Sequence, residues 1–151
     1  MEAEKINALI IEPGKFPRRI EIANELDELQ KAVGGNIEVA RYFHEPVGLI
    51  VNEEGKIIGL PLNRTIYGDD GEDKDIMAGT FLVVGLTEDD FKSLTEKQME
   101  KYEGKFHHPE AFVMTFGGIR VVQIPDEEVQ KRMEKEARTA APKIENREEC
   151  L

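Results

Sequence analysis

Short apolar runs joined by turn-forming residues limit the architectures that this chain can adopt. Residues 47–51 and 56–60 are two such runs, and the residues between them are Asn-Glu-Glu-Gly. A short polar turn between two strand-like runs predicts a β-hairpin. Strands that are neighbours in sequence pair antiparallel when the turn is tight, because parallel neighbours need a longer crossover connection. We therefore expect an α+β fold in which two or three helices pack on an antiparallel sheet.

The other predicted strands are apolar or alternate apolar with charged residues, and several of them end at glycine or proline. They cover residues 5–12, 18–23, 37–39 with an extension over 41–43, 76–86, 112–116 and 119–124. The last two flank Gly117-Gly118, which predicts a second hairpin. Residues 63–75 are polar and contain glycine, so we expect a loop there.

A first helix is predicted after residue 24. Asn24 has a side chain suited to capping a helix N-terminus, and Gly34 with Gly35 is a typical helix end. Leu26, Leu29 and Val33 follow the helical spacing. We expect these three side chains to pack on one face of the sheet.

A second helix carries the strongest local signal in the chain. Thr95 and Gln98 have the spacing of a capping box, and Leu94 and Met99 have that of a hydrophobic staple. The expected buried face of this helix consists of Met99, Tyr102 and Phe106. Both the start of the helix and its orientation are therefore predicted from sequence.

A third helix is predicted to start at Pro125-Asp126. Its apolar stripe is thin and consists of Val129, Met133 and Ala137. A thin stripe on a charged helix is typical of a peripheral helix or of one that packs on another subunit. We therefore expect a homo-oligomer whose interface includes this helix or the second hairpin. Residues 1–141 are expected to form one domain, followed by a charged and mobile tail over residues 142–151.

The acidic charge balance argues against conventional nucleic-acid binding. The net charge is −11, whereas DNA- and RNA-binding proteins normally present a basic surface to the phosphates. Acidity mainly promotes solubility, although it also permits mimicry of DNA charge. Cys150 is the only cysteine, and no apolar stretch approaches the roughly 20 residues that span a bilayer. We expect a cytoplasmic protein without a disulfide and without membrane contact.

Catalytic and metal-binding patterns are weak in this sequence. Ser93 is the only serine and precedes a helix cap, and Cys150 lies next to the chain end. His107 and His108 are adjacent, and adjacent side chains point apart on most backbones. The acidic run of residues 69–75 does not match a calcium loop, because its glycine is out of register with the ligand positions. We expect no catalytic residues, no metal site and no cofactor.

The remaining candidates are polar residues at predicted strand ends and in the predicted loop. Arg64 is the most informative of them, because it lies beside an amide side chain between apolar runs. It could form a structural ion pair with Asp75 or another carboxylate. Spacing alone favours this structural role, and the alternative is that Arg64 binds a phosphate or carboxylate with its two-pronged guanidinium.

Four stretches resemble a known family: GGNIEVARYF, LIVNEEGKIIGLPLNR, DIMAGTFLVVG and FKSLTEKQMEKYEGKF. Residues 1–106 resemble the uncharacterised family called domain of unknown function 3846. Members of this family occur in bacteriophages and in integrative or conjugative elements of bacteria, mainly Firmicutes. The resemblance implies an accessory protein of a phage or mobile element, with a suspected role in counter-defence. It implies no enzymatic activity.

Together these observations favour a protein that binds and sequesters a small anionic ligand of the nucleotide-signal type, without chemical change. The expected ligand-binding residues are Asn52, Asn63, Arg64, Tyr67, Asp75, Gly79, Thr80 and Phe81. The alternative is an acidic inhibitor that binds a host protein, with DNA mimicry as one form. An enzyme with an unfamiliar acid–base site is the weakest alternative. A ligand-binding protein should direct Asn63 and Arg64 into a pocket, whereas an inhibitor should use them structurally.

Overall fold

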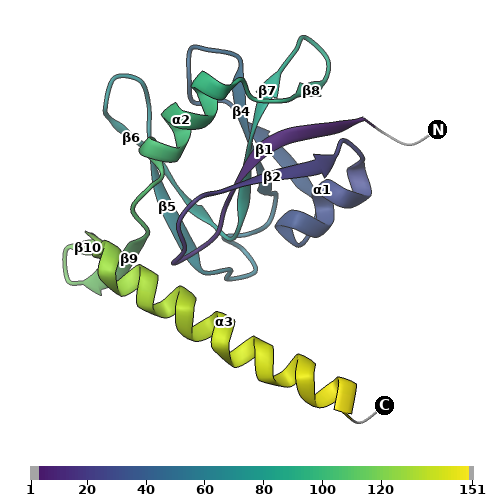
Figure 1. Ribbon diagram of the computed structural model, residues 1–151. Coiled ribbons are helices and arrows are strands. Elements are labelled where there is room, and N and C mark those ends of the chain that lie inside the picture. Colours follow the sequence, from purple (N-terminus) through teal and green to yellow (C-terminus); the bar gives the residue numbers. More distant parts are fainter. Residues whose placement is uncertain (1–3, 150–151) are drawn as a thin grey trace.

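The computed structural model describes residues 4–149, and it describes their side chains outside residues 73–74 and 140–149. The elements follow the order β1 (Lys5–Ile11), β2 (Arg18–Ala23), α1 (Leu26–Val33), β3 (Ile37–Ala40), β4 (Val47–Asn52), β5 (Leu62–Tyr67), β6 (Asp73–Ala78), β7 (Phe81–Leu86), β8 (Phe91–Lys92), α2 (Glu96–Lys105), β9 (Glu110–Thr115), β10 (Gly118–Gln123) and α3 (Asp126–Glu149). Strands pair antiparallel throughout this range, as Figure 1 shows, so the expected α+β fold is confirmed.

The main sheet has the strand order β2-β1-β7-β4-β3, and the short β8 pairs with β7. Its centre consists of β4 and β7, in which all residues are buried. Leu49 of β4 pairs with Val83 of β7, and Ile10 of β1 pairs with Leu82. Near-continuous apolar runs form these central strands because both of their faces are covered.

Two clusters of apolar side chains lie on opposite faces of the main sheet. Strand residues alternate between the faces, so Leu82 and Val84 belong to one cluster and Phe81 and Val83 to the other. The first cluster also contains Leu29 and Val33 of α1. The second contains the buried face of α2 and residues of β5 and β6, namely Met99, Tyr102, Phe106, Ile66 and Met77. Helices therefore cover both faces of the sheet.

The predicted hairpin over residues 47–60 is wrong in its second arm. Residues 47–52 form β4, but residues 53–59 form turns, and β4 pairs with β3 and β7 instead. Gly59 has a positive φ of 76°, and Leu60 N donates to Gly55 O at 2.9 Å. This compact turn leaves Ile57 85% exposed, so its apolar sequence does not mark a strand.

The predicted loop over residues 63–75 is also wrong, because it contains most of β5 and the first residues of β6. The predicted single strand over residues 76–86 is instead divided between β6 and β7. Gly79 lies at the division with a φ of 81°, a left-handed conformation that interrupts an extended strand. The chain thus forms a second, two-stranded sheet of β5 and β6, which packs beside the main sheet.

The first predicted helix forms, with two differences at its start. The N-cap residue is Glu25, and the side chain of Asn24 donates to Asp90 Oδ1 at 3.0 Å instead of capping the helix. Leu26 is 58% exposed and lies outside the core, whereas Leu29 and Val33 are buried as expected. The predicted strand extension over residues 41–43 does not form.

The later elements agree with the sequence analysis. The capping box of Thr95 and Gln98 is present, and Leu94 and Met99 are both buried. The β9–β10 hairpin and α3 also form where expected. Along the predicted stripe of α3, Val129 is buried and Met133 is partly buried. The backbone of α3 continues to Glu149, and the mobility of the expected tail over residues 142–151 stays a prediction.

Candidate functional site

Asn63 and Arg64 both point into the protein, although neighbours on a regular strand point to opposite faces. The register between β5 and β6 shifts between the pair Leu62–Ala78 and the pair Arg64–Met77. Such an irregularity redirects side chains locally. As a result, residues 63–66 are all buried.

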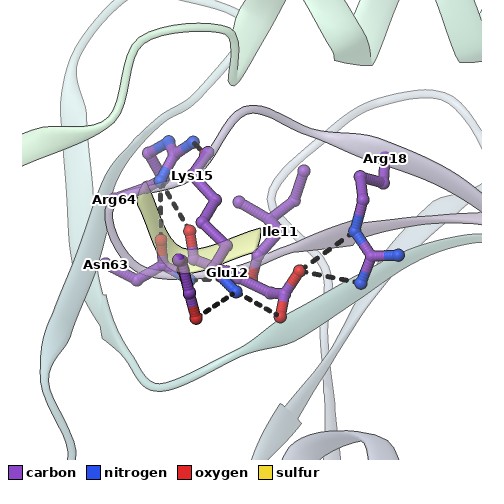
Figure 2. A network of polar contacts seen from close by, with 7 residues as sticks. Ile11, Glu12, Lys15, Arg18, Asn63 and Arg64 are labelled. Atoms are coloured by element: carbon purple, nitrogen blue, oxygen red, sulfur yellow. Dashed lines mark hydrogen bonds and ion pairs between the residues drawn. The ribbon is translucent and has the colours of Figure 1, made fainter. Parts of the chain in front are cut away.

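Arg64 is 1% exposed and uses its guanidinium within the protein (Figure 2). Its Nε donates to Phe106 O at 3.1 Å, its Nη1 to Glu12 O at 3.3 Å and to Asn63 Oδ1 at 2.7 Å, and its Nη2 to Lys15 O at 2.6 Å. A buried arginine commonly pairs with a carboxylate. Here the hydrogen-bond acceptors are three backbone carbonyl oxygens and one amide oxygen, so the structural role of Arg64 takes the form of hydrogen bonds and not of the ion pair that was considered with Asp75 or another carboxylate.

Burial is the main cause that changes the ionisation of Arg64. It lowers the pKa of the guanidinium to about 10, and the charge of Glu110 opposes this effect. The group therefore stays charged at neutral pH, with the dipoles of the accepting carbonyls directed toward it. This arrangement holds the loop between β1 and β2, strand β5 and the end of α2 together.

Asn63 is fully buried and completes the same network. Its Nδ2 donates to Ile11 O and to Gly79 O, both at 2.9 Å, while its Oδ1 accepts from Arg64. The amide thus joins the end of β1 to the corner between β6 and β7. These hydrogen bonds satisfy the polar atoms of the Asn63 side chain, which explains why an asparagine is stable in an apolar interior.

The predicted ligand contacts after β6 serve packing and chain geometry. A Cβ atom at Gly79 would lie 2.7 Å from Leu60 Cδ1, and Gly79 N donates to Pro61 O at 2.7 Å. Phe81 is 1% exposed, and its ring packs edge-to-face on Phe106 with centroids 5.4 Å apart. The ring of Phe81 is therefore not accessible for stacking on a ligand. Thr80 is partly buried and directly precedes β7.

Asp75 belongs to a separate polar group at the edge of β6. Its carboxylate accepts hydrogen bonds from Lys56, from Tyr42 Oη at 3.1 Å and from Ile76 N at 2.8 Å. Burial raises the pKa of Asp75, but these hydrogen bonds outweigh it and lower the pKa below its ordinary value. Burial and the charge of Asp75 raise the pKa of Tyr42 to about 12.

Asn52 stabilises the end of α1 from the neighbouring strand. Its Nδ2 donates to Val33 O at 3.1 Å, and its Oδ1 accepts from Glu54 N at 2.9 Å. The C-terminal carbonyls of a helix lack partners within the helix, and Asn52 supplies one. Its role is thus explained by α1 and the following turn.

The predicted site residues do not converge on one pocket. Asn52 and Asp75 line a cleft of about 250 Å³, in which Glu38 and Glu53 accompany a single lysine, Lys56. Arg64 and Tyr67 line a different recess of about 50 Å³, together with Lys105, Phe106, His108 and Glu110. Binding of a ligand by the eight predicted residues together is therefore not supported by their positions.

Two features at the C-terminal side were missed or misjudged from sequence. The rings of His107 and His108 both contact Asp126, at 3.0 and 3.3 Å, so the expectation that these neighbours point apart is wrong here. The second feature is the β9–β10 hairpin, whose apolar side chains are largely exposed. The apolar sequence predicted the two strands, but it did not predict that their side chains are exposed.

Residues 6–107 match the family described as "Domain of unknown function (DUF3846)". The chain belongs to this family. The matched range contains the main sheet, β5, β6, α1 and α2, and it ends before β9. No curated protein and no solved structure matches the chain. Across residues 4–149, none of the helices has the length and apolar character required to cross a membrane.

Proposed function

We propose that this DUF3846 protein acts by binding another protein, without catalysing a reaction, and that the β9–β10 hairpin is its contact surface. The observation that carries this proposal is the exposure of apolar side chains along the hairpin. Phe116 at the tip is fully exposed, Met114 is 79% exposed and Val113 is 50% exposed. Ile119 and Val122 on the second strand are exposed as well. Contiguous apolar surface of this kind marks interaction sites in folded proteins.

Both faces of the hairpin carry apolar side chains. Met114 pairs with Ile119 and Phe112 with Val121 on one face, while Val122 pairs with Ala111 on the other. An isolated two-stranded hairpin is marginally stable in water, and it is stabilised by packing on other elements. Contacts of β9 with β5 anchor its base, where Glu110 Oε1 accepts from Thr65 N at 2.6 Å. A partner that covers the outer part would supply the missing packing.

The charge distribution favours a second copy of the same chain as this partner. Each chain carries a net charge of −11, so two copies repel each other over most of their surfaces. Residues 111–124 contain one charged residue, Arg120, and this is where two acidic copies can approach. Cores of interfaces are depleted in charge in the same way. Two-fold symmetric dimers, which bring the same patch together, are the commonest assemblies.

The third helix offers less free apolar surface than expected from sequence. Val129 is completely buried, and Met133 lines a shallow cleft with Lys15 of the β1–β2 loop and Arg18 of β2. Lys15 Nζ also lies 3.3 Å from Glu136 Oε1. Of the two predicted interfaces, the hairpin is therefore the one that we propose.

Sedimentation velocity on wild-type protein and on the double variant Met114→Ser, Phe116→Ser tests this proposal. In a concentration series that reaches about 0.1 mM, wild type should form a dimer at the upper end, and the variant should stay monomeric throughout. The matched control is Ile57→Ser, Ile58→Ser, which removes two exposed apolar side chains from a different surface and should stay dimeric. A monomeric wild type over this range, or a dimeric hairpin variant, contradicts the proposal.

Sequestration of a small anionic ligand is a second candidate. The recess beside Arg64 favours it, since Lys105 and His108 also line this recess. Its volume of about 50 Å³ is far smaller than a nucleotide site, because pockets for small molecules usually span about 300–1,000 Å³. Calorimetry with inorganic phosphate and a nucleotide panel, on wild type and Lys105→Gln, tests this candidate. Unchanged binding in the variant, or none in wild type, would remove it.

The biological context that we propose for either candidate is counter-defence in a phage or mobile element. A protein-binding inhibitor would serve this role by blocking a host factor, and a ligand-binding protein would serve it by capturing a signal. The two are separated by the experiments above, because only the first depends on Met114 and Phe116.

A further inference from the structure

His107, His108 and Asp126 meet at the base of the β9–β10 hairpin. His107 Nε2 lies 3.0 Å from Asp126 Oδ2, and His108 Nδ1 lies 3.3 Å from Asp126 Oδ1. One potential ligand atom from each residue lies within 4.8 Å of the other two. The two histidines precede β9 and the aspartate begins α3, so the cluster links both ends of the hairpin.

We propose that these three side chains bind a divalent transition-metal ion, with Zn²⁺ as the ion that fits best. Two imidazoles and one carboxylate are a typical set of protein ligands for Zn²⁺, and they leave one position for water. This proposal is independent of the protein contact proposed for the hairpin tip.

The distances agree with a tetrahedral ion after small movements. Zinc–nitrogen and zinc–oxygen distances of about 2.0–2.2 Å place neighbouring ligand atoms about 3.3–3.5 Å apart. The two histidine–aspartate distances are already near this value, and because they end on different carboxylate oxygens, the carboxylate of Asp126 must turn for one oxygen to serve as the ligand. The histidine nitrogens lie no more than 4.8 Å apart, so they need to approach by at most about 1.5 Å. All three side chains are partly exposed, so His108 and Asp126 have room to adjust around His107.

The surroundings hold the cluster in a favourable arrangement. The ring of His107 stacks on Phe16 with centroids 4.9 Å apart, which fixes its plane. The rings of His107 and His108 lie at 84° to each other, so their nitrogens approach the carboxylate from different directions. The N-terminus of α3 carries a partial positive charge that opposes a cation. Glu127, beside Asp126 in the first turn, counteracts this charge, whereas Glu128 forms an ion pair with Arg132 at 2.6 Å.

A metal at this position would fasten the two ends of the hairpin together. Ile124 N already donates to Pro109 O at 2.8 Å, so the two chain segments are adjacent before a metal binds. The family match ends at His107. The ion would therefore join the last matched residue to the first turn of α3, and it would stabilise the junction between the DUF3846 domain and the C-terminal elements.

Titration calorimetry with Zn²⁺ tests this site in a Cys150→Ser background, which removes the thiol as a competing ligand. We expect one ion per chain, a rise in melting temperature on zinc addition, and loss of affinity by about tenfold or more in His108→Ala and in Asp126→Asn. His44→Ala is the matched control, since it removes the third histidine outside this cluster, and it should bind as tightly as the parent. Circular dichroism confirms that each variant is folded.

Cobalt provides an independent readout of the ligand geometry. Co²⁺ in a tetrahedral site absorbs visible light much more strongly than octahedral Co²⁺ in water. We expect such absorption in the Cys150→Ser protein and in the His44 control, and its loss in His108→Ala. Equal zinc affinity in the parent and in both cluster variants, or a loss that occurs with His44→Ala instead, overturns the proposal.

Discussion

Arg64 Nη1 donates to the side-chain oxygen of its neighbour Asn63 at 2.7 Å, so two consecutive residues form one buried polar unit. A regular strand would separate their side chains onto opposite faces. The register shift in β5 brings both inward, where they meet carbonyl oxygens from the loop after β1, from the β6–β7 corner and from the end of α2. The pair thus connects segments that are distant in sequence. This geometry supports a structural role for the residues that the sequence singled out as ligand contacts.

Arg64→Ala is predicted to destabilise the protein by about 3–5 kcal/mol. The substitution leaves a cavity and removes four hydrogen bonds, each of which contributes about 1 kcal/mol or more. Urea denaturation measures the free energy of unfolding. The control is Arg41→Ala, an exposed arginine whose removal should change stability by less than about 0.5 kcal/mol.

Arg64→Lys separates the shape of the side chain from its charge. Lysine keeps the charge, but its single ammonium cannot replace the planar fork that reaches acceptors in different directions. We expect a loss of stability between that of wild type and that of Arg64→Ala. A normal unfolding midpoint in both variants, combined with loss of phosphate or nucleotide binding, would instead show that Arg64 contacts a ligand.

Local signals in the sequence were reliable where the structure depends on neighbours in the chain. The capping box of Thr95 and Gln98 and the left-handed glycine at Gly34 both occur as predicted, because each is fixed within one helix end. The central strands were also recognisable, since burial on both faces requires continuous apolar sequence. These signals were sufficient to predict the α+β class.

Local turn geometry and long-range contacts account for the errors. Ile57 and Ile58 look like strand residues, but the turns around Gly59 expose them. The polar sequence near Arg64 looks like a loop, although its hydrogen bonds to remote carbonyls satisfy it inside the core. The histidine cluster depends on the position of Asp126 across a whole hairpin. Periodicity and composition contain no information on such contacts.

Gly79→Ala is predicted to destabilise the protein by about 2–3 kcal/mol. An alanine at a φ of 81° costs about 1–2 kcal/mol, and its Cβ would also overlap with Leu60 Cδ1, which lies 2.7 Å away. Gly71 has the same φ, but no atom would lie within 4 Å of a Cβ at that residue. Gly71→Ala should therefore cost only the conformational part. Thermal unfolding of both variants checks the difference, and equal losses would show that the contact with Leu60 is unimportant.

Thr95→Ala is predicted to cost about 1 kcal/mol, the usual effect of removing an N-cap side chain. Thr95 Oγ1 accepts from Gln98 N at 3.1 Å, and Gln98 Oε1 accepts from Thr95 N at 3.0 Å. Lys97→Ala, an exposed substitution in the same helical turn, should be neutral. Chemical denaturation of the two variants measures both effects. Alanine favours helix at least as well as lysine, so a loss in Lys97→Ala as large as that in Thr95→Ala would show that the loss is not specific to the cap.

Asp75 is predicted to contribute stability that depends on pH. Its pKa is lower in the folded protein than the value of about 3.9 expected in the unfolded chain, because the hydrogen bonds from Lys56, Ile76 and Tyr42 outweigh burial. The charged carboxylate therefore stabilises the fold fully above the unfolded pKa, and this contribution is lost as the pH falls through the folded pKa.

Asp75→Asn removes the titrating group while keeping the size of the side chain. We expect the difference in unfolding free energy between wild type and Asp75→Asn to be largest near neutral pH and to shrink below about pH 4. Urea denaturation at a series of pH values measures this difference. Lys56→Met supplies the control, since it removes a hydrogen bond that lowers the pKa of Asp75 and should flatten the profile. A difference that stays constant from neutral pH to pH values well below 4 would mean that the contacts of Asp75 stabilise the fold independently of its charge.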